Sequence, residues 1–208
     1  MKFETDIEAG TITMRGAIGD FENGISADDF RDALNEHSGG PVTIHLNSEG
    51  GSVTDGLSIY NAIMQHDGEV TIHIDTIAAS IATVISAAAD KVVMNSNAKY
   101  MIHCAWTIAA GNSTEFKNMS QILDMMDKDI AEAYSQRTGG SQQEMLALMK
   151  DETWMDSETA LAMGFVDEVY KVERQPAANS VKEAFAMAPF VASKASATAR
   201  RMKLRLKK

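Results

Sequence analysis

The chain has 208 residues, 45% of them hydrophobic, which is enough for one domain with a full apolar core and too little for a second large domain. Its formal net charge of -10 argues against nucleic-acid binding by the core domain, because phosphate recognition needs an excess of Lys and Arg. One cysteine excludes an internal disulfide and a multi-cysteine metal site, and we find no signal peptide or membrane-length apolar run, so we expect a cytoplasmic protein without membrane contact.

Strand and helix signals alternate from the start of the chain. Thr11 to Ile18 has the apolar and polar mixture of a strand, and Ser26 is an N-cap candidate for a helix that reaches Glu36. Val42 to Leu46 predicts the next strand, which runs directly into a glycine turn. The later elements predicted in this half are a helix over 57–64, a strand over 70–74, a helix over 78–89 and strands over 91–94 and 100–103.

The second half begins with a long predicted helix, Ser113 to Arg137. Its apolar residues form one broad, methionine-rich stripe, which suits either the core or an interface between subunits. Two further helices, over 142–149 and 157–163, and a strand over 165–172 complete the pattern. Strands that alternate with helices indicate an α/β fold.

The predicted domain covers residues 1–173, and residues 174–208 are predicted to be a linker and a basic tail. This segment is rich in Ala and Ser and holds two of the chain's three prolines. From Arg200 to Lys208 there are six basic residues and no acidic one. We interpret the run as a solvated, flexible end, with an electrostatic docking tag as the alternative.

The first candidate for chemistry is the pair Gly50-Gly51, which follows a strand. Without Cβ atoms, the backbone N–H groups can approach a ligand closely, so the turn could form an oxyanion hole. A double glycine after a strand is also common as a plain turn. No Lys-Ser or Lys-Thr follows, which argues against a phosphate-binding loop.

Ser80 is the candidate nucleophile. It lies among small residues after a strand and at the predicted start of a helix, where its Oγ would be exposed near the positive end of the helix dipole. The N–H of the next residue, Ile81, would then be an oxyanion donor. Small-residue runs with one serine also occur in close-packed helices with a capping hydroxyl, so this segment alone leaves both interpretations open.

A serine nucleophile needs a base within hydrogen-bond reach, which makes the five histidines the test. His103 ends a predicted strand ahead of a glycine-containing loop, at a sheet edge where active sites of α/β proteins gather, so it is the best candidate. His45 and His73 lie on strands with apolar neighbours, where a structural role is expected. Cys104 would indicate a cysteine protease, but adjacent strand residues point to opposite faces, which argues against a His103–Cys104 pair.

A third group must orient the imidazole and stabilise its charged form. Asp151 and Glu152 lie in a predicted loop between two helices, and either could reach His103. Each is also explained as an acid that favours the dipole of the next helix.

Taken in order, these segments resemble the ClpP family of serine peptidases over roughly Thr11 to Val172. The Thr153-Trp154 pair and the short N-terminus are most similar to the ClpP-related head-maturation (prohead) proteases of tailed bacteriophages. The segments that carry the resemblance are Asn47–Val53, Ala78–Ser80, Met101–His103, Thr153–Trp154, Glu158–Ala160 and Gly164–Asp167.

The resemblance implies a ClpP/crotonase-like spiral of βαβ units with a protruding handle helix, and peptide-bond hydrolysis without a metal or cofactor. It makes Ser80 the nucleophile and His103 the general base. It makes the N–H groups of Gly51 and Ile81 the oxyanion hole.

The third member of the triad and two loop positions depart from the family pattern. Counting back from the aromatic residue before Met155 places Glu152 where the family has its aspartate, with Asp151 as the runner-up. Glu49 stands where the family usually has proline, and Thr76 where a glycine commonly precedes the nucleophile turn.

The resemblance also implies partners. It predicts self-association into rings, with the 113–137 helix at the contact between rings. Because the segment that binds an ATP-driven unfoldase is short here, we expect ATP-independent action on capsid or scaffold proteins during head maturation.

Two other function classes remain open. A crotonase-like enzyme acting on acyl-CoA shares the fold class and uses two backbone N–H donors, but it does not need Ser80, His103 and an acid together. A catalytically inactive ring or scaffold component is the second, for which the changes at Glu49 and Thr76 give mild support.

Overall fold

The structure is a computed structural model that describes residues 3–22 and 24–171, all within one compact unit. The predicted domain boundary at residue 173 and the predicted linker and basic tail over 174–208 lie outside the described residues. No helix in the described part of the chain is both long and apolar enough to cross a membrane.

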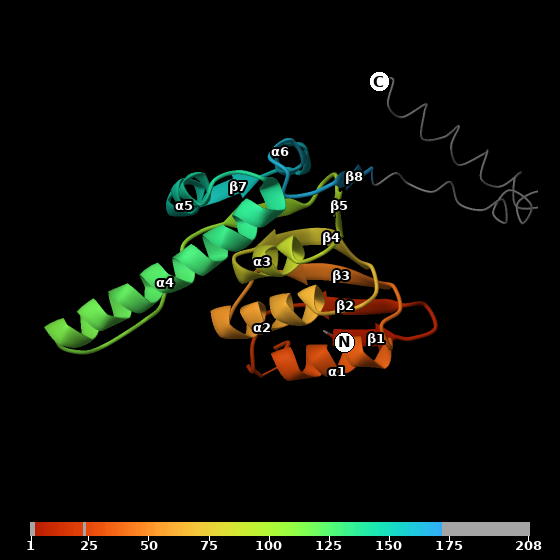
Figure 1. Ribbon diagram of the computed structural model, residues 1–208, viewed down its shortest axis with the longest axis horizontal. Coiled ribbons are helices and arrows are strands. Elements are labelled where there is room, and N and C mark those ends of the chain that lie inside the picture. The colour runs from red at the N-terminus through yellow and green to blue at the C-terminus, as the bar shows by residue number, and fades with distance from the viewer. Residues whose placement is uncertain (1–2, 23, 172–208) are drawn as a thin grey trace, which may run out of the picture. The chain divides into compact units, whose positions relative to one another are not determined.

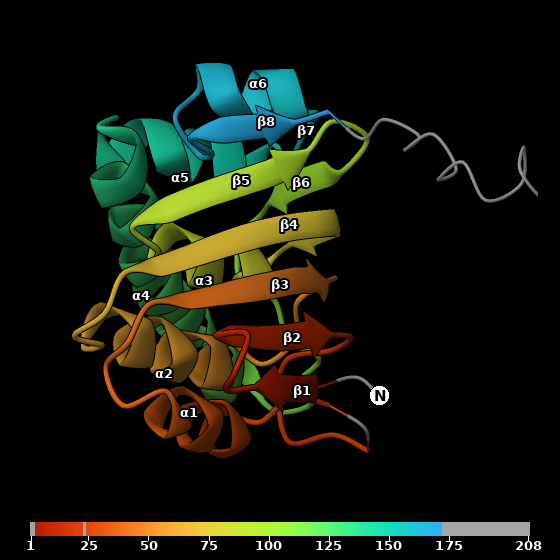
Figure 2. The same ribbon diagram turned by 90° about the vertical axis from the view of Figure 1, so that its right-hand side faces the viewer.

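Among the described residues, eight strands form one sheet (Figure 2). Their bounds are β1 (Phe3–Asp6), β2 (Thr11–Arg15), β3 (Val42–Ser48), β4 (Val70–Ala79), β5 (Lys91–Asn95), β6 (Lys99–Ile102), β7 (Thr153–Met155) and β8 (Glu168–Tyr170). The main path runs β1-β2-β3-β4-β5-β8, and β6 pairs with both β4 and β7. The pairs β2–β3, β3–β4, β4–β5, β4–β6 and β5–β8 are parallel, so the α/β prediction is confirmed.

The helices are α1 (Ala27–Glu36), α2 (Val53–Met64), α3 (Ile81–Ala87), α4 (Ser113–Thr138), α5 (Gln142–Lys150) and α6 (Ser157–Ala162). The predicted N-cap Ser26 accepts a hydrogen bond from the N–H of Asp29, and Gly139 ends α4 in the left-handed conformation, with φ of 74°. Figure 2 shows α1 to α4 behind the sheet, while its other face is open towards the viewer.

Side chains along each strand alternate between these two faces of the sheet. On β3 and β4 the apolar residues Ile44, Leu46, Ile72 and Ile74 are fully buried. Burial of this continuous apolar layer against the helices is the main stabilising contribution to the fold. The residues between them, such as His45 and His73, are only partly buried and lie on the open face.

Strand β4 changes its partner halfway along. Its residues Thr71–Ile74 pair with β5, whereas Ile77–Ala79 pair with β6. The sheet therefore divides at Asp75 and Thr76, and the end of β4 runs beside the end of β6. This division brings the residue after β4 next to the residue after β6.

The sequence predictions were wrong for several elements. Ala78 and Ala79 belong to β4 and not to a helix, so α3 begins only at Ile81. The predicted loop that holds Glu152 leads directly into β7, and β1 was missed. These short strands form only because a neighbouring strand supplies their hydrogen bonds.

The long helix α4 is buried over only part of its length. Ile130 and Tyr134 are buried, but Phe116 and Met125 are 52% and 64% exposed. Figure 1 shows the N-terminal part of α4 extending beyond the other elements. The methionine-rich stripe therefore belongs to the core at one end of α4 only, and the other end remains an exposed apolar surface.

Candidate active site

Ser80 lies between β4 and α3 in an unusual backbone conformation. Its φ is 56° and its ψ is -132°, a region that a residue with a side chain rarely adopts. Its N–H donates to the carbonyl oxygen of Met101 at 2.9 Å, and its carbonyl accepts from the N–H of Thr83 at 2.9 Å. The turn resembles the strained strand-to-helix elbow that exposes a nucleophilic side chain in the α/β hydrolases.

Two hydroxyl groups, those of Thr83 and Tyr134, support this turn. The Oγ1 of Thr83 donates to the carbonyl oxygen of Ser80 at 2.5 Å and lies 2.6 Å from the hydroxyl of Tyr134 on α4. Burial raises the pKa of Tyr134 well above its ordinary value, and the nearby Tyr100 raises this pKa further. The phenol therefore stays neutral. Neither Thr83 nor Tyr134 is predicted from the sequence as a support of Ser80, because the two residues are distant in the chain and meet only in the folded protein.

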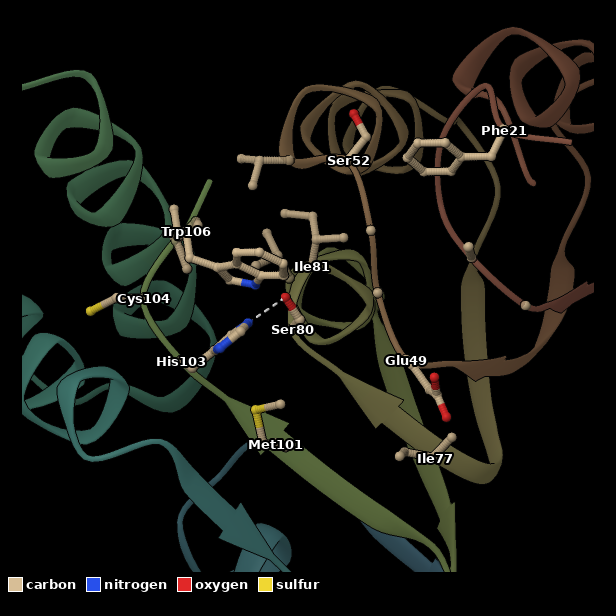
Figure 3. Close-up of a pocket in the computed structure, with 18 of the residues that line it drawn as sticks. Phe21, Glu49, Ser52, Ile77, Ser80, Ile81, Met101, His103, Cys104 and Trp106 are labelled. Carbon is tan, nitrogen blue, oxygen red and sulfur yellow. Dashed lines mark hydrogen bonds between the residues drawn. The ribbon is translucent and has the colours of Figure 1, made fainter. Parts of the chain in front are cut away.

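His103 directly follows β6 and faces Ser80. Its Nε2 lies 2.7 Å from Ser80 Oγ, within hydrogen-bond distance (Figure 3). The loop after it is fixed to α4, because the N–H of Ala105 donates to Asp127 Oδ1 at 2.7 Å. Within residues 3–22 and 24–171, no hydrogen bond to His103 Nδ1 is found, so this nitrogen is open to an orienting group.

The glycine turn after β3 lies against the Ser80 turn. A Cβ atom on Gly50 would lie 2.7 Å from the carbonyl oxygen of Ala79 and 2.7 Å from Ser80 Cβ, so only glycine allows this approach. The carbonyl of Gly50 accepts from the N–H of Ile18 at 2.9 Å, which fixes the turn. Among the described residues, the N–H groups of Gly51 and Ile81 have no hydrogen-bond acceptor.

The two candidate acids follow α5. Asp151 is the C-cap residue of α5, whereas Glu152 has a positive φ of 48°. The Glu152 Oε1 accepts a hydrogen bond from the indole Nε1 of Trp154 at 3.3 Å. In the described part of the chain, neither carboxylate is hydrogen-bonded to His103.

A pocket of about 660 Å³ opens beside Ser80 and His103 (Figure 3). Apolar side chains line most of it, including Ile81, Val84 and Ile130. Among the described residues that line this pocket, Glu49 is the one with a carboxylate. The pocket therefore suits a mainly apolar side chain next to a serine hydroxyl, an imidazole and two unpaired N–H groups.

Cys104 lines the same pocket, but its side chain points away from Ser80 (Figure 3). Partial burial raises the pKa of its thiol to about 11, and a hydrogen bond to Asp127 together with the negative charge of that carboxylate adds to the shift. The group is therefore a neutral thiol at neutral pH. A cysteine nucleophile is not supported by this geometry.

Comparisons with known proteins find relatives by sequence and by fold. The family model described as Clp protease matches residues 32–173. The ATP-dependent Clp protease proteolytic subunit of Leuconostoc citreum is 31% identical over 133 residues, which cover 62% of this chain and 66% of that protein. The subunit of the same name from Pleurastrum terricola is 32% identical over 128 residues, covering 61% and 65%. The chain thus spans slightly less than two thirds of the length of these curated relatives.

A solved structure, a ClpP1 point mutant from Listeria monocytogenes, has a similar fold. The TM-score is 0.70 at 26% sequence identity, and the match covers 80% of this chain and 94% of the solved one.

The strain at Ser80 can be measured with two substitutions that both remove its hydroxyl. We expect Ser80→Gly to unfold with a free energy about 1 kcal/mol larger than Ser80→Ala, because glycine adopts a positive φ without steric cost. Urea denaturation followed by circular dichroism compares the two variants. Equal stability, or a less stable glycine variant, would contradict strain at this turn.

The raised pKa of Cys104 predicts a slow reaction with alkylating reagents. At pH 7.5 we expect iodoacetamide to modify Cys104 at least about 100-fold more slowly than free cysteine, because only the thiolate reacts. The rate should rise steadily as the pH increases towards 11. Mass spectrometry of timed samples gives the rate, and a rate close to that of free cysteine at pH 7.5 would disprove the shift.

Proposed function

The chain belongs to the Clp protease family, and on this premise we propose that it is a serine endopeptidase with Ser80 as nucleophile and His103 as general base. The observation that carries the proposal is the 2.7 Å contact between Ser80 Oγ and His103 Nε2, at a strained turn beside a pocket. Serine is a weak nucleophile at neutral pH, and a base at this distance activates it.

The proposed reaction begins when Ser80 Oγ attacks the scissile carbonyl and His103 Nε2 takes the serine proton. Negative charge then develops on the carbonyl oxygen, and the N–H groups of Gly51 and Ile81 stabilise it. His103 returns the proton to the leaving amine, so that an acyl-enzyme remains on Ser80. A water molecule, activated by the same imidazole, hydrolyses the ester and restores the serine.

For Nε2 to accept a proton, the neutral imidazole must carry its hydrogen on Nδ1, and an acid at Nδ1 stabilises that state. We propose Glu152 for this role. Strands β6 and β7 are antiparallel, with Ile102 opposite Thr153, and continuing this register by one residue would pair His103 with Glu152. Rotation of the Glu152 side chain away from Trp154 would bring its carboxylate towards the imidazole.

We further propose that the protein assembles into rings through α4. The support is the exposed apolar surface of its N-terminal part, formed by Phe116, Ile122 and Met125. The proposed substrates are capsid or scaffold proteins in the cytoplasm of a phage-infected cell, because the Thr153-Trp154 pair resembles head-maturation proteases. Such accessible substrates would not need an ATP-driven unfoldase, whereas the relatives are named as subunits of an ATP-dependent protease.

The alternatives are less well supported. A crotonase-like acyl-CoA enzyme would use the two N–H groups but would not need a serine and a histidine in hydrogen-bond contact. An inactive ring component would have no reason to keep Ser80 in a strained backbone conformation that brings it to an imidazole.

A fluorophosphonate probe tests the proposed activity. We expect the assembled, full-length protein to form a covalent adduct at Ser80 and to cleave unfolded casein without ATP. Ser80→Ala should lose labelling and cleavage but keep its assembly state in analytical ultracentrifugation, because the change removes the nucleophile and little volume. An assembled sample without a Ser80 adduct would disprove the protease, whereas cleavage that requires an unfoldase would disprove only the ATP-independent role.

The acid can be identified with matched isosteric variants. We expect Glu152→Gln to lower kcat for a fluorogenic peptide by about 10²- to 10⁴-fold, because an amide does not stabilise the charged imidazole. Asp151→Asn is the control and should stay within about twofold of the unmodified enzyme. The reverse order would assign the role to Asp151, and two unaffected variants would exclude both residues.

A further inference from the structure

Three side chains of metal-binding type meet on the open face of the sheet. His45 on β3 and His73 on β4 are direct partners across the strand pair, and Asp75 follows two residues after His73. Since side chains alternate along a strand, all three project from the same face. None of them lines the described pocket that contains Ser80.

The distances within this cluster suit a metal ion. The Nδ1 atom of His45 and the Nδ1 atom of His73 each lie 3.1 Å from Asp75 Oδ1. The possible ligand atoms of the three residues all lie within 4.8 Å of one another. Neighbouring ligands of a tetrahedral zinc ion, each bound at about 2.0–2.1 Å, are about 3.3 Å apart. Two of the three separations therefore nearly match such a site, and small side-chain rotations would close the third.

The surrounding residues orient the carboxylate. A guanidinium nitrogen of Arg15 lies 3.3 Å from Asp75 Oδ2, which leaves Oδ1 directed to the imidazoles. Asn95 Nδ2 donates to the carbonyl oxygen of Asp75 at 2.8 Å. The Asn95 Oδ1 atom is buried and has no hydrogen-bond donor in the described part of the chain.

The cluster is open to solvent on one side. The side chains of His45, His73 and Asp75 are 38%, 21% and 21% exposed. An ion can therefore enter without unfolding of the sheet, and water can complete its coordination. Open sites with three protein ligands and one water are typical of zinc bound by histidine and carboxylate.

We propose that His45, His73 and Asp75 bind one divalent transition-metal ion, with Zn²⁺ as the best fit. Two imidazole nitrogens and one carboxylate oxygen are ligands that zinc accepts, whereas Mg²⁺ and Ca²⁺ prefer oxygen alone. The ion would connect β3 to β4, the strands that lead to the glycine turn and to Ser80. Sequence analysis does not find this site, because the two histidines meet only through strand pairing.

The competing interpretation is a purely hydrogen-bonded cluster, in which both Nδ1–H groups donate to Asp75. The two interpretations require opposite tautomers. A metal ligand needs the lone pair of Nδ1 and carries its proton on Nε2, whereas a hydrogen-bond donor carries the proton on Nδ1. Metal binding therefore has a signature that a hydrogen-bonded cluster lacks.

Zinc titration of the untagged, full-length protein tests the proposal. A Cys104→Ser background removes the only thiol, which could otherwise bind zinc adventitiously. We expect isothermal titration calorimetry to give one Zn²⁺ per chain, and the melting temperature to rise by about 5 °C at zinc concentrations 100 times Kd. Co²⁺ in place of Zn²⁺ should give the visible absorption of a tetrahedral or five-coordinate ion.

Variants locate the binding. Asp75→Asn and His73→Gln should each weaken zinc binding at least about tenfold, and His45→Gln provides a third variant if either is poorly folded by circular dichroism. His66→Gln is the matched control, because His66 Nε2 binds the carbonyl oxygen of Gly40 and lies outside the cluster. The proposal is wrong if the parent protein binds no stoichiometric zinc, or if binding survives in the folded cluster variants.

Discussion

The backbone conformation of Ser80 is the constraint on which the rest of the site depends. A serine with positive φ costs free energy, of the order of 1–3 kcal/mol, so neighbouring groups must hold it in place. Its N–H is bound by the carbonyl of Met101, its carbonyl by Thr83, and Gly50 packs directly behind it. These contacts come from β6, α3 and the turn after β3, so the turn forms only when the sheet is complete. The position of the Ser80 hydroxyl is therefore a product of tertiary structure and not of local sequence preference.

The division of β4 between two partners supplies the geometry around this turn. If β4 paired with β5 along its whole length, His103 would not lie beside Ser80. Because the second half of β4 pairs with β6, the ends of both strands meet and Nε2 reaches Oγ at 2.7 Å. The same division leaves the carbonyl of Asp75 without a ladder partner on β5, and the side chain of Asn95 takes that place. One irregularity of the sheet thus produces both the Ser80–His103 contact and the distinctive corner at Asp75.

The sequence predicted the parts of the molecule that depend on local patterns. The cap at Ser26 and the long helix α4 follow from short-range rules, and the structure has them. It did not predict β1 or β7, which pair in antiparallel fashion with β2 and β6 and take their hydrogen bonds from these strands. Ser80 and His103 became candidates because each follows or ends a predicted strand within a recognisable segment. The support that Tyr134 gives to Ser80 through Thr83 was not predicted, since no periodicity connects residues that meet only through packing.

The proposed acid Glu152 and the cluster of His45, His73 and Asp75 both depend on strand register, which the sequence alone does not give. Counting along the sequence favoured Glu152 over its neighbour Asp151. The antiparallel register of β6 and β7, which pairs Ile102 with Thr153, adds support for this choice, because its continuation by one residue would pair His103 with Glu152. In the same way, His45 and His73 are unremarkable until the parallel register of β3 and β4 makes them direct partners. Alternation along a strand then separates their chemistry from the apolar layer under the helices, without any cost to core packing. A sheet of this kind can therefore hold a strained turn at the end of β4 and an independent polar cluster on its uncovered face, because strand register, and not sequence distance, determines which side chains meet.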